Sequence, residues 1–375
     1  MDVSATPRPR GDPLPEPLPC ARAAHAKDPD ATVGSARHLY IYIDLYNKCN
    51  LRCTMCTAHS PDEAPVSLSP QRFATLAQQA FPRARQVNLS CAYEPLMHKT
   101  LFDDLAVAAH YRVPELVLTT NGTLLTPDKA QRLIDAELTR LHVSIDGSSA
   151  ATYEAIRRPA RFATLLDNLT HFNTLRQTLG RGPALQLQMV VMPENQHEVP
   201  AFVERFATLS PQRLLFIHRD FQRPQGPAAL QRQALLRQAL QACAARGIAF
   251  GEYPEFCIPT QEVLRAYGGQ GVLPTSKPGC VDPWNFLSVK PDGSVAVCPN
   301  GAAGVGNLNE TDLAELWNGP AAQRLRTALN DRQTPAPCQH CAYRDHGVVQ
   351  IYRSFDRMQT LLAQSMGQHP GAEVR

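Results

Sequence analysis

The chain has 375 residues, of which 43% are apolar and 19% are charged. This composition excludes a disordered or fibrous protein and suits one large domain or two to three smaller ones. Lys and Arg total 37 against 34 Asp and Glu, and so small a net charge, +3, speaks against nucleic acid as a partner.

The N-terminus and the cysteine content indicate the compartment. No apolar run approaches the roughly 18 residues of a membrane span, and the first residues lack the basic start and apolar stretch of a signal peptide. We therefore expect a cytoplasmic protein without membrane contact. Residues 1–36, with six prolines between Pro7 and Pro19, are predicted to form a disordered tail. In the cytoplasm the 11 Cys are expected to be metal ligands or reactive thiols rather than disulfides.

Residues 37–251 show a repeated strand and helix pattern. Short stretches rich in β-branched residues, each followed by a helix-like segment, lie at 38–45, 85–91, 115–120, 140–145, 185–192 and 213–218. Ser69-Pro70 and Thr126-Pro127 are typical helix starts. Strands that alternate with helices predict parallel pairing, and hence an α/β fold with a partial (β/α)6, TIM-like barrel whose chemistry lies at the C-terminal strand ends.

A second, smaller domain is predicted over residues 252–349. After a helical stretch at about 226–246, residues 286–298 read as a β-hairpin around the turn PDGS, and helix-like sequence follows. Residues 350–375 are expected to form a C-terminal helix and tail.

Three cysteines follow the first predicted strand directly. Cys49, Cys53 and Cys56 have the spacing C-x3-C-x2-C. Three thiolates on one loop can hold three irons of a [4Fe–4S] cluster and leave the fourth iron open to an incoming ligand. A structural zinc site that includes His59, or buried free thiols, are the alternatives.

This triplet resembles the signature of the radical S-adenosylmethionine (SAM) enzymes, whose fold is a partial (β/α)6 barrel. The resemblance implies that the open iron binds the amino and carboxylate groups of SAM. It also implies that Met55, directly before the third Cys, packs on the SAM adenine. The family's Gly-Gly-Glu-Pro segment corresponds to Ala92, Tyr93, Glu94 and Pro95, so Glu94 is expected to accept from the SAM amino group although both glycines are replaced.

Three more segments resemble strand ends of this family. In LTTNGTLLT, Asn121 is expected to face the cofactor. In HVSIDGSSAATYEAIR, Ser144 and Arg157 match residues that hold the SAM carboxylate and ribose, with Asp146 nearby. In VVMPENQHEVPAFV, Asn195 is expected to sit by the cofactor or to brace the loop. From the residues alone, Ser144 and Asp146 could instead cap strand ends, and Arg157 could lie on a helix surface.

A second cysteine set lies in the C-terminal region. Cys280 and Cys298 are separated by x12-Gly293-x4, and Cys338 and Cys341 form C-x2-C. Four such thiolates can close a zinc site or a fully ligated [4Fe–4S] cluster. The spacing resembles the SPASM domain of radical SAM enzymes or its shorter twitch form, which implies an auxiliary [4Fe–4S] cluster. Because no Cys follows these four, we expect one auxiliary cluster, as in the twitch form.

Four residues outside the two sets are candidates for catalysis. Cys91 ends the second predicted strand, and Cys257 precedes the auxiliary cysteines in a loop. Either thiol could return a hydrogen atom to a substrate radical, or could be a small buried residue. His218 and Asp220 follow the sixth strand and are expected to contact the substrate or to accept a proton, the alternative being solvated loop residues.

The resemblance implies a reaction that begins with an electron from a donor such as flavodoxin or ferredoxin. SAM is cleaved, and a 5'-deoxyadenosyl radical takes a hydrogen atom from a small-molecule or peptide substrate. We expect an oxidoreductase that dehydrogenates a sugar or aminocyclitol, like the twitch-bearing dehydrogenase of aminoglycoside assembly, which has a similar auxiliary-Cys spacing. Epimerisation through a Cys donor and peptide crosslinking are alternatives. Remote alternatives are a non-catalytic iron–sulfur electron-transfer protein and a zinc protein.

Overall fold

The computed structural model describes most of the chain between residues 37 and 341. The described ranges are 37–58, 63–90, 92–219, 225–253, 257–268, 280–299, 303–339 and 341. The predicted N-terminal tail, the predicted C-terminal helix and tail, His59, Cys91 and Asp220 lie outside these ranges.

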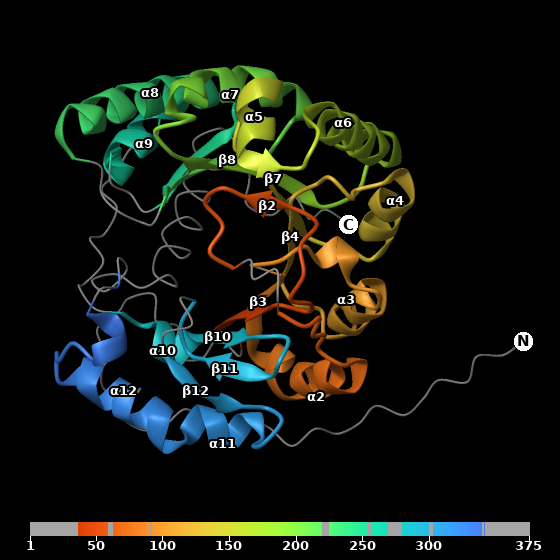
Figure 1. Cartoon of the computed structure of the whole chain (residues 1–375), viewed down its shortest axis with the longest axis vertical. Coiled ribbons are helices and arrows are strands. Elements are labelled where there is room, and N and C mark those ends of the chain that lie inside the picture. Colours follow the sequence, from red (N-terminus) through yellow and green to blue (C-terminus); the bar gives the residue numbers. More distant parts are fainter. Residues whose placement is uncertain are drawn as a thin grey trace, which may run out of the picture.

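A curved sheet of ten strands organises the described residues (Figure 1). Seven strands pair in parallel: β1 (Leu39–Ile43), β3 (Ala84–Leu89), β4 (Glu115–Thr120), β5 (Arg140–Ser144), β7 (Ala184–Val191), β8 (Arg213–His218) and β9 (Ala249–Tyr253). At the other side of β1 the sheet continues with β10 (Phe286–Val289), β11 (Ser294–Ala296) and β12 (Gly304–Asn307). The first six parallel strands confirm the predicted barrel-like α/β fold.

Two features of the sheet go beyond the prediction. β9 adds a further parallel strand beside β8, and it spans the predicted domain limit at residue 251. The predicted hairpin is present as β10 and β11, but β10 also pairs in parallel with β1. The C-terminal region therefore extends the same sheet as the barrel, while the domain limits stay a prediction.

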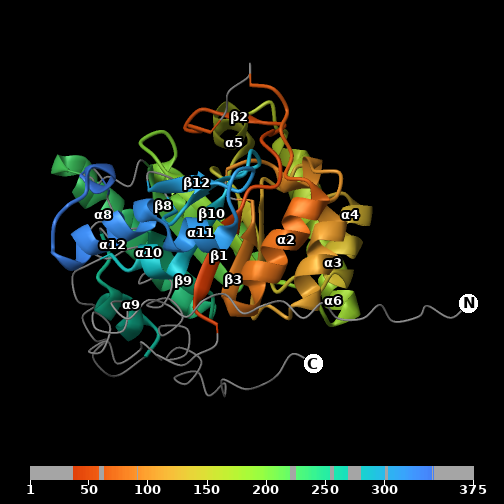
Figure 2. The same ribbon diagram turned by 90° about the horizontal axis from the view of Figure 1, so that it is seen from below.

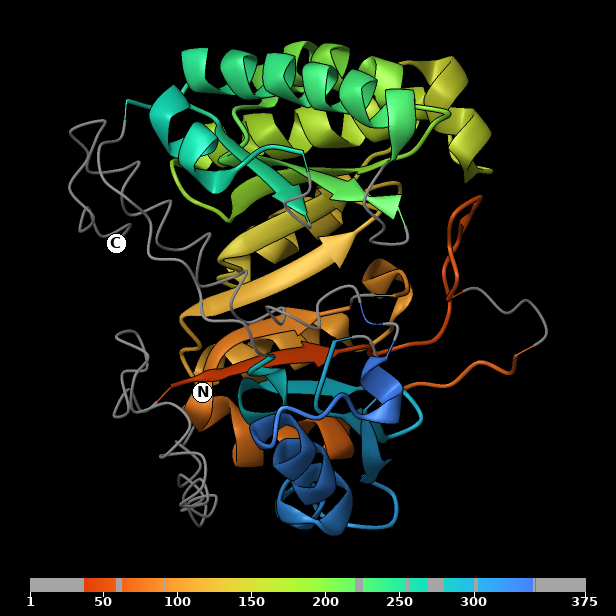
Figure 3. The ribbon, with the colours of Figure 1, turned by 90° about the vertical axis from the view of Figure 1, so that its left-hand side faces the viewer.

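Helices cover the outer face of the sheet (Figures 1 and 3). They are α2 (Pro70–Ala80), α3 (Leu101–His110), α4 (Pro127–Asp135), α6 (Phe162–Leu179), α7 (Val199–Phe206) and α8 (Gly226–Ala245). The short helices α5 (Ala150–Ile156), α9 (Thr260–Ala266), α10 (Asp282–Asn285) and α11 (Leu313–Asn318) and the longer α12 (Pro320–Asn330) complete the set. There are 3-10 turns at Phe81–Arg83, Pro95–Met97, Gln196–Glu198, Ala207–Leu209 and Ala336–Cys338. Within the described residues no helix has both the length and the apolar character that a membrane crossing needs.

The predicted helix starts are confirmed by their caps. The Ser69 hydroxyl accepts from the backbone N–H of Arg72 at the start of α2, and the Thr126 hydroxyl accepts from the N–H of Lys129 at the start of α4. A proline follows each cap, where the missing N–H costs no helical hydrogen bond.

Strand alternation separates an apolar outer face from a polar concave face. On β5, Leu141 and Val143 belong to the hydrophobic core beneath the helices. The alternate residues, His142 and Ser144, therefore point to the concave side. The same argument puts Asn88, Thr119, Gln186 and Gln188 on the concave side, because their neighbours along β3, β4 and β7 lie in that core.

A short ribbon stands at the C-terminal ends of the parallel strands. β2 (Arg52–Cys53) pairs antiparallel with β6 (Arg157–Arg158), which directly follows α5. Figure 2 shows β2 and α5 at the same end of the molecule. This ribbon joins the cysteine loop after β1 to the segment after β5.

The hairpin between β10 and β11 turns at Gly293. This residue has φ +87°, in the left-handed region that favours glycine. Its N–H donates to the Lys290 carbonyl, and its carbonyl accepts from the Leu308 N–H. A Cβ at this position would lie 2.7 Å from the Asn307 side-chain oxygen.

We predict that Gly293→Ala lowers the free energy of unfolding by about 2 kcal/mol, because strain at positive φ adds to the contact with Asn307. Gly180→Ala is the control: Gly180 has φ +61°, and no atom lies within 4 Å of an added Cβ. It should cost about 1 kcal/mol. Urea unfolding of the metal-free protein measures both, and an equal loss would contradict the expectation.

Candidate active site

Cys49, Cys53 and Cys56 lie on the loop that follows β1. Cys49 and Cys53 are half-buried and Cys56 is exposed. Two N–H groups point at the Cys49 sulfur: the backbone of Leu51 at 3.4 Å and Asn121 Nδ2 at 3.8 Å. Donors directed at sulfur stabilise a thiolate, so this loop fits the metal cluster that its spacing implies.

Burial raises the pKa of Cys49 to about 11, although the Leu51 N–H opposes this. Burial also raises the pKa of Cys53, while the Arg157 guanidinium opposes it. Cys49 interacts electrostatically with Cys53, and Cys53 with Cys56. The Cys49 and Cys53 thiols are therefore protonated at neutral pH when no metal is bound, and a bound cluster must displace these protons.

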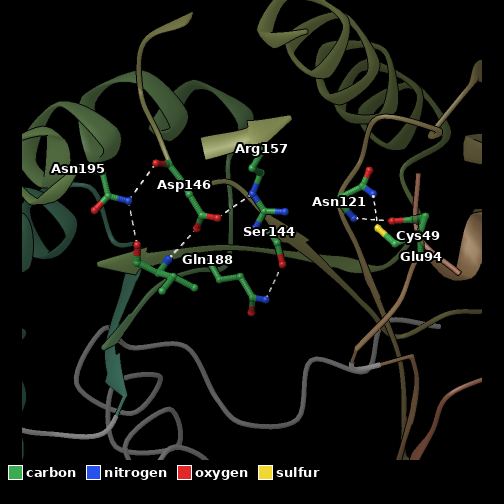
Figure 4. A network of polar contacts seen from close by, with 9 residues as sticks. Cys49, Glu94, Asn121, Ser144, Asp146, Arg157, Gln188 and Asn195 are labelled. Atoms are coloured by element: carbon green, nitrogen blue, oxygen red, sulfur yellow. Dashed lines mark hydrogen bonds and ion pairs between the residues drawn. The ribbon is translucent and has the colours of Figure 1, made fainter. Parts of the chain in front are cut away.

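Asn121 links this loop to the end of β4. Its Nδ2 donates to the Asn50 side-chain oxygen at 2.9 Å, and its Oδ1 accepts from the N–H and hydroxyl of Thr123. Asn50 in turn donates to the Thr123 hydroxyl at 2.8 Å. Asn121 therefore lies beside Cys49 (Figure 4), and its predicted orientation toward the cofactor stays a prediction.

Glu94 is buried, and three groups of the protein donate to its carboxylate. They are the Thr120 hydroxyl at 2.7 Å, the Asn121 N–H at 2.8 Å and the Leu96 N–H at 3.1 Å. Its own N–H donates to the Lys48 carbonyl at 3.1 Å, next to Cys49. Burial raises the pKa of Glu94 although these hydrogen bonds oppose it. Glu94 thus fastens the end of β4 to the cysteine loop, and its predicted contact with SAM stays a prediction.

Asp146 and Arg157 form a buried ion pair with 2.7 Å between Arg157 Nε and Asp146 Oδ2. The other carboxylate oxygen accepts from the Val190 N–H at 2.8 Å. Asn195 Nδ2 donates to the carbonyls of Asp146 and Val190, and its Oδ1 accepts from the Met192 N–H. Figure 4 shows this network beside Ser144. Asn195 therefore braces the loop after β7, and its predicted contact with SAM stays a prediction.

Arg157 is buried rather than on a helix surface. It lies in β6, which pairs with β2, and its charge acts on the Cys53 thiol. Burial alone would lower the pKa of Arg157, but the negative charge of the neighbouring Asp146 opposes this, and the pKa is raised overall. Met55 is half-buried on the same loop between Cys53 and Cys56.

Ser144 contacts a residue that the sequence analysis missed. Gln188 Nε2 donates to the Ser144 hydroxyl at 2.7 Å, and both side chains point to the concave side (Figure 4). The alternation of Gln186 and Gln188 with apolar residues in LQLQMVV was the available signal, because polar residues at a period of two mark one face of a strand.

The second set of thiols also gathers in space. Burial raises the pKa of Cys280, and Asp282, Cys341 and Cys338 contribute. Burial likewise raises the pKa of Cys338, with contributions from Cys341 and Cys298. All four cysteines are half-buried, so an all-sulfur donor set is available for a metal cluster.

His218 and Cys257 lie in a buried cluster on the helix side of the sheet. His218 shares the face of Phe216, which packs on Phe202 of α7. His218 Nε2 lies 2.6 Å from Glu252 Oε1 and 4.0 Å from the Cys257 sulfur. The Glu252 carboxylate also accepts from the backbone N–H groups of Cys257 and Ile258, at 2.7 Å each.

This cluster has the donor types of a zinc site, with nitrogen, oxygen and sulfur within 4.8 Å of one another. Arg232 of α8 argues against a cation there, because its Nη1 lies 3.4 Å from His218 Nδ1. A guanidinium only donates, so Nδ1 accepts from Arg232 and Nε2 is the nitrogen that donates to Glu252. The contacts fasten the ends of β8 and β9 to α8, and a catalytic role of His218 or Cys257 stays a prediction.

We predict that Arg157→Met lowers the free energy of unfolding of the metal-free protein by about 3 kcal/mol, because it leaves the buried Asp146 carboxylate without a counter-charge. Arg161→Met is the control. Arg161 forms an ion pair with Glu154, but the Arg161 side chain is 77% exposed, and exposed ion pairs contribute little to stability. The unfolding midpoint of this control in urea should match that of the unchanged protein. Equal midpoints for the two variants would show that the buried pair adds no stability.

Two protein-family models match the barrel and the C-terminal region that carry the two cysteine sets. The model of the radical SAM superfamily matches residues 43–206, and that of SPASM, an iron–sulfur cluster-binding domain, matches residues 280–342. The chain is 24% identical to the GTP 3',8-cyclase of Marinobacter nauticus, over 84% of this chain and 93% of that protein. It is also 24% identical to the AdoMet-dependent heme synthase of Nitratidesulfovibrio vulgaris, over 83% of this chain and 86% of that protein.

Solved structures share the fold at lower identity. SuiB of Streptococcus suis, bound to the precursor peptide SuiA, has a TM-score of 0.60 at 15% identity and covers 78% of this chain and 67% of its own. Native anSMEcpe with bound AdoMet has a TM-score of 0.56 at 14% identity and covers 87% of this chain and 100% of its own. The chain therefore belongs to the radical SAM superfamily and carries a SPASM iron–sulfur domain after its barrel.

Proposed function

We propose that this radical SAM enzyme dehydrogenates a small polar molecule, such as a sugar or aminocyclitol. The observation that carries the proposal is a band of uncharged hydrogen-bonding side chains on the concave faces of β3, β4, β5 and β7, bordered on β8 by Arg213 in register with Gln186. Thr119, one of this band, donates to the Asn88 side chain at 3.2 Å, and Gln188 donates to Ser144 at 2.7 Å. Hydroxyl and amide groups bind hydroxyl-rich substrates without the cost of burying an unpaired charge.

His142 belongs to the same band and carries an unused donor or acceptor. It pairs in register with Thr119 on one side and Gln186 on the other. Its Nε2 is buried and has no hydrogen-bond partner among the described residues. Burial lowers the pKa of His142 well below its usual range, with Arg140 and Arg213 contributing, so the ring is neutral at pH 7. A neutral imidazole that lacks a partner suits a substrate hydroxyl.

The cofactor-binding roles belong to this proposal too. Cys49, Cys53 and Cys56 would hold a [4Fe–4S] cluster that binds SAM, and the four C-terminal thiols would hold one auxiliary [4Fe–4S] cluster, as in the twitch form. When bound, the first cluster with SAM would supply hydrogen-atom abstraction from the substrate, and the auxiliary cluster would supply an acceptor for the electron that the substrate then loses together with a proton.

The protein's own residues position these groups. Asn121 orients Cys49, and Arg157 places a positive charge beside Cys53 and, in the proposal, beside the SAM carboxylate. Met55 would pack on the adenine, and Ser144 would contact the ribose or carboxylate of SAM. Glu94 and Asn195 would contact SAM from the loops that they brace. A flavodoxin or ferredoxin would deliver the electron in the cytoplasm.

Two other outcomes remain candidates. Peptide modification is supported by the similarity in fold to SuiB, which was solved with a precursor peptide. Epimerisation requires a hydrogen donor, for which Cys257 and Cys91 were predicted. Cys257 contacts His218 and Glu252 on the helix side of the sheet, away from the concave face, and this placement favours oxidation over hydrogen return.

The cluster assignment predicts about eight iron atoms per chain after anaerobic reconstitution with iron and sulfide, because seven Cys form a three-ligand and a four-ligand set. Replacing Cys49, Cys53 and Cys56 together by Ala should leave about four iron atoms and abolish the formation of 5'-deoxyadenosine from SAM. Cys243→Ala, which removes a buried thiol of α8, is the control and should keep both. SAM cleavage by the triple variant would refute the assignment.

The reaction class can be read from product mass. We expect aminocyclitols or hexoses, rather than Cys- or Ser-containing peptides, to stimulate the formation of 5'-deoxyadenosine and to yield a product about two mass units lighter, since oxidation removes two hydrogens. In deuterated water, a product one unit heavier with inverted configuration would instead establish epimerisation. Stimulation by peptides alone would identify a peptide-modifying enzyme.

A further inference from the structure

Asp44 lies at the point where the barrel meets the C-terminal hairpin. It follows β1 directly, between β3 and β10, and its side chain is 3% exposed. Asp44 Oδ2 accepts from Lys290 Nζ at 2.9 Å, and Lys290 directly follows β10. The backbone N–H of Asp44 also donates to the Val289 carbonyl at 3.0 Å.

The other oxygen of this carboxylate reaches the segment after β3. Asp44 Oδ1 accepts from the Ala92 N–H at 3.0 Å. Ala92 begins the segment 92–95, which contains Glu94 and corresponds to the family's segment for the SAM amino group. One buried carboxylate thus bridges the hairpin and this segment, although Asp44 and Lys290 are 246 residues apart in sequence.

Segment 92–95 is also fastened from the barrel side. The Glu94 N–H donates to the Lys48 carbonyl, and the Ser90 hydroxyl donates to the Tyr93 carbonyl at 2.7 Å. Lys290 also acts on Tyr93: burial raises the pKa of the Tyr93 phenol, and the Lys290 charge opposes this. The segment is therefore held between the cysteine loop on one side and the hairpin on the other.

We propose that Lys290 is a positioning residue: through Asp44 it makes the conformation of segment 92–95, and with it SAM affinity, depend on the C-terminal hairpin. Only the part of the proposal that concerns SAM affinity rests on the proposed function. Without Lys290 the buried Asp44 carboxylate still accepts from the Ala92 N–H but loses the ammonium group that lies 2.9 Å from its Oδ2, so the conformation that aligns Ala92 is less favoured.

Hydrogen exchange tests the bridge without cofactor. In the metal-free protein, Lys290→Met should increase the exchange of the backbone amides of residues 92–94, 96 and 97 by about tenfold, whereas Lys290→Arg should keep it near that of the unchanged chain. Arg181→Met is the control, because it removes a half-exposed partner of Asp135 at the C-terminal end of α4. Unchanged exchange in Lys290→Met would overturn the proposal. If that variant does not fold, Lys290→Gln takes its place with the same expectations.

Equilibrium dialysis tests the consequence for SAM. In the reconstituted protein, Lys290→Met should raise the Kd for SAM about fivefold, and Lys290→Arg should restore it. Asp44→Asn combined with Lys290→Met should raise it no further, because both changes break one bridge. A normal Kd in Lys290→Met, or additive effects, would contradict the proposal. If the unchanged protein binds no SAM, the proposed function fails, while hydrogen exchange still decides whether the bridge exists.

Discussion

Buried carboxylates hold the C-terminal strand ends of this protein in register. Four carboxylates each accept a hydrogen bond from a backbone N–H group. The pairs are Asp44 with Ala92, Glu94 with Asn121, Asp146 with Val190, and Glu252 with Cys257. In each case a carboxylate from one strand end or loop satisfies a backbone donor in a later segment of the chain. A hydrogen bond from a buried N–H group to a carboxylate is strong and directional. These hydrogen bonds therefore fix the loops beyond the strand ends, where the hydrogen bonds between strands stop.

This arrangement explains how a site can be formed from loops. The described residues of the cysteine loop form only the two-residue strand β2 and a single bridge between Tyr46 and Ser67, yet this loop contacts Asn121, Glu94 and β6. The loops of the parallel sheet thus carry the chemistry, and the sheet and its carboxylates fix their positions.

The sequence predicted the barrel strands well, because their apolar runs are short, rich in β-branched residues and separated by capped helices. It did not predict that β10 pairs with β1, since no local pattern encodes a pairing between segments so distant in the chain. It also could not orient His218, because both faces of β8 are apolar: Leu214 and Phe216 lie on one, Leu215 and Ile217 on the other. The cysteine spacings were informative because ligand spacing follows from metal geometry rather than from the fold.

The parallel pairing of β10 with β1 has a consequence for the modularity of the chain. β1 is an inner strand only because the C-terminal hairpin lies beside it. A barrel cut before β10 would present the backbone N–H and C=O groups of residues 40–43 as an open edge, flanked by Tyr40, Tyr42 and the core residues Ile41 and Ile43. Such an edge is a template for pairing between chains. The iron–sulfur domain therefore also serves as the barrel's protection against self-association, and the two parts are better regarded as one inseparable sheet than as exchangeable units.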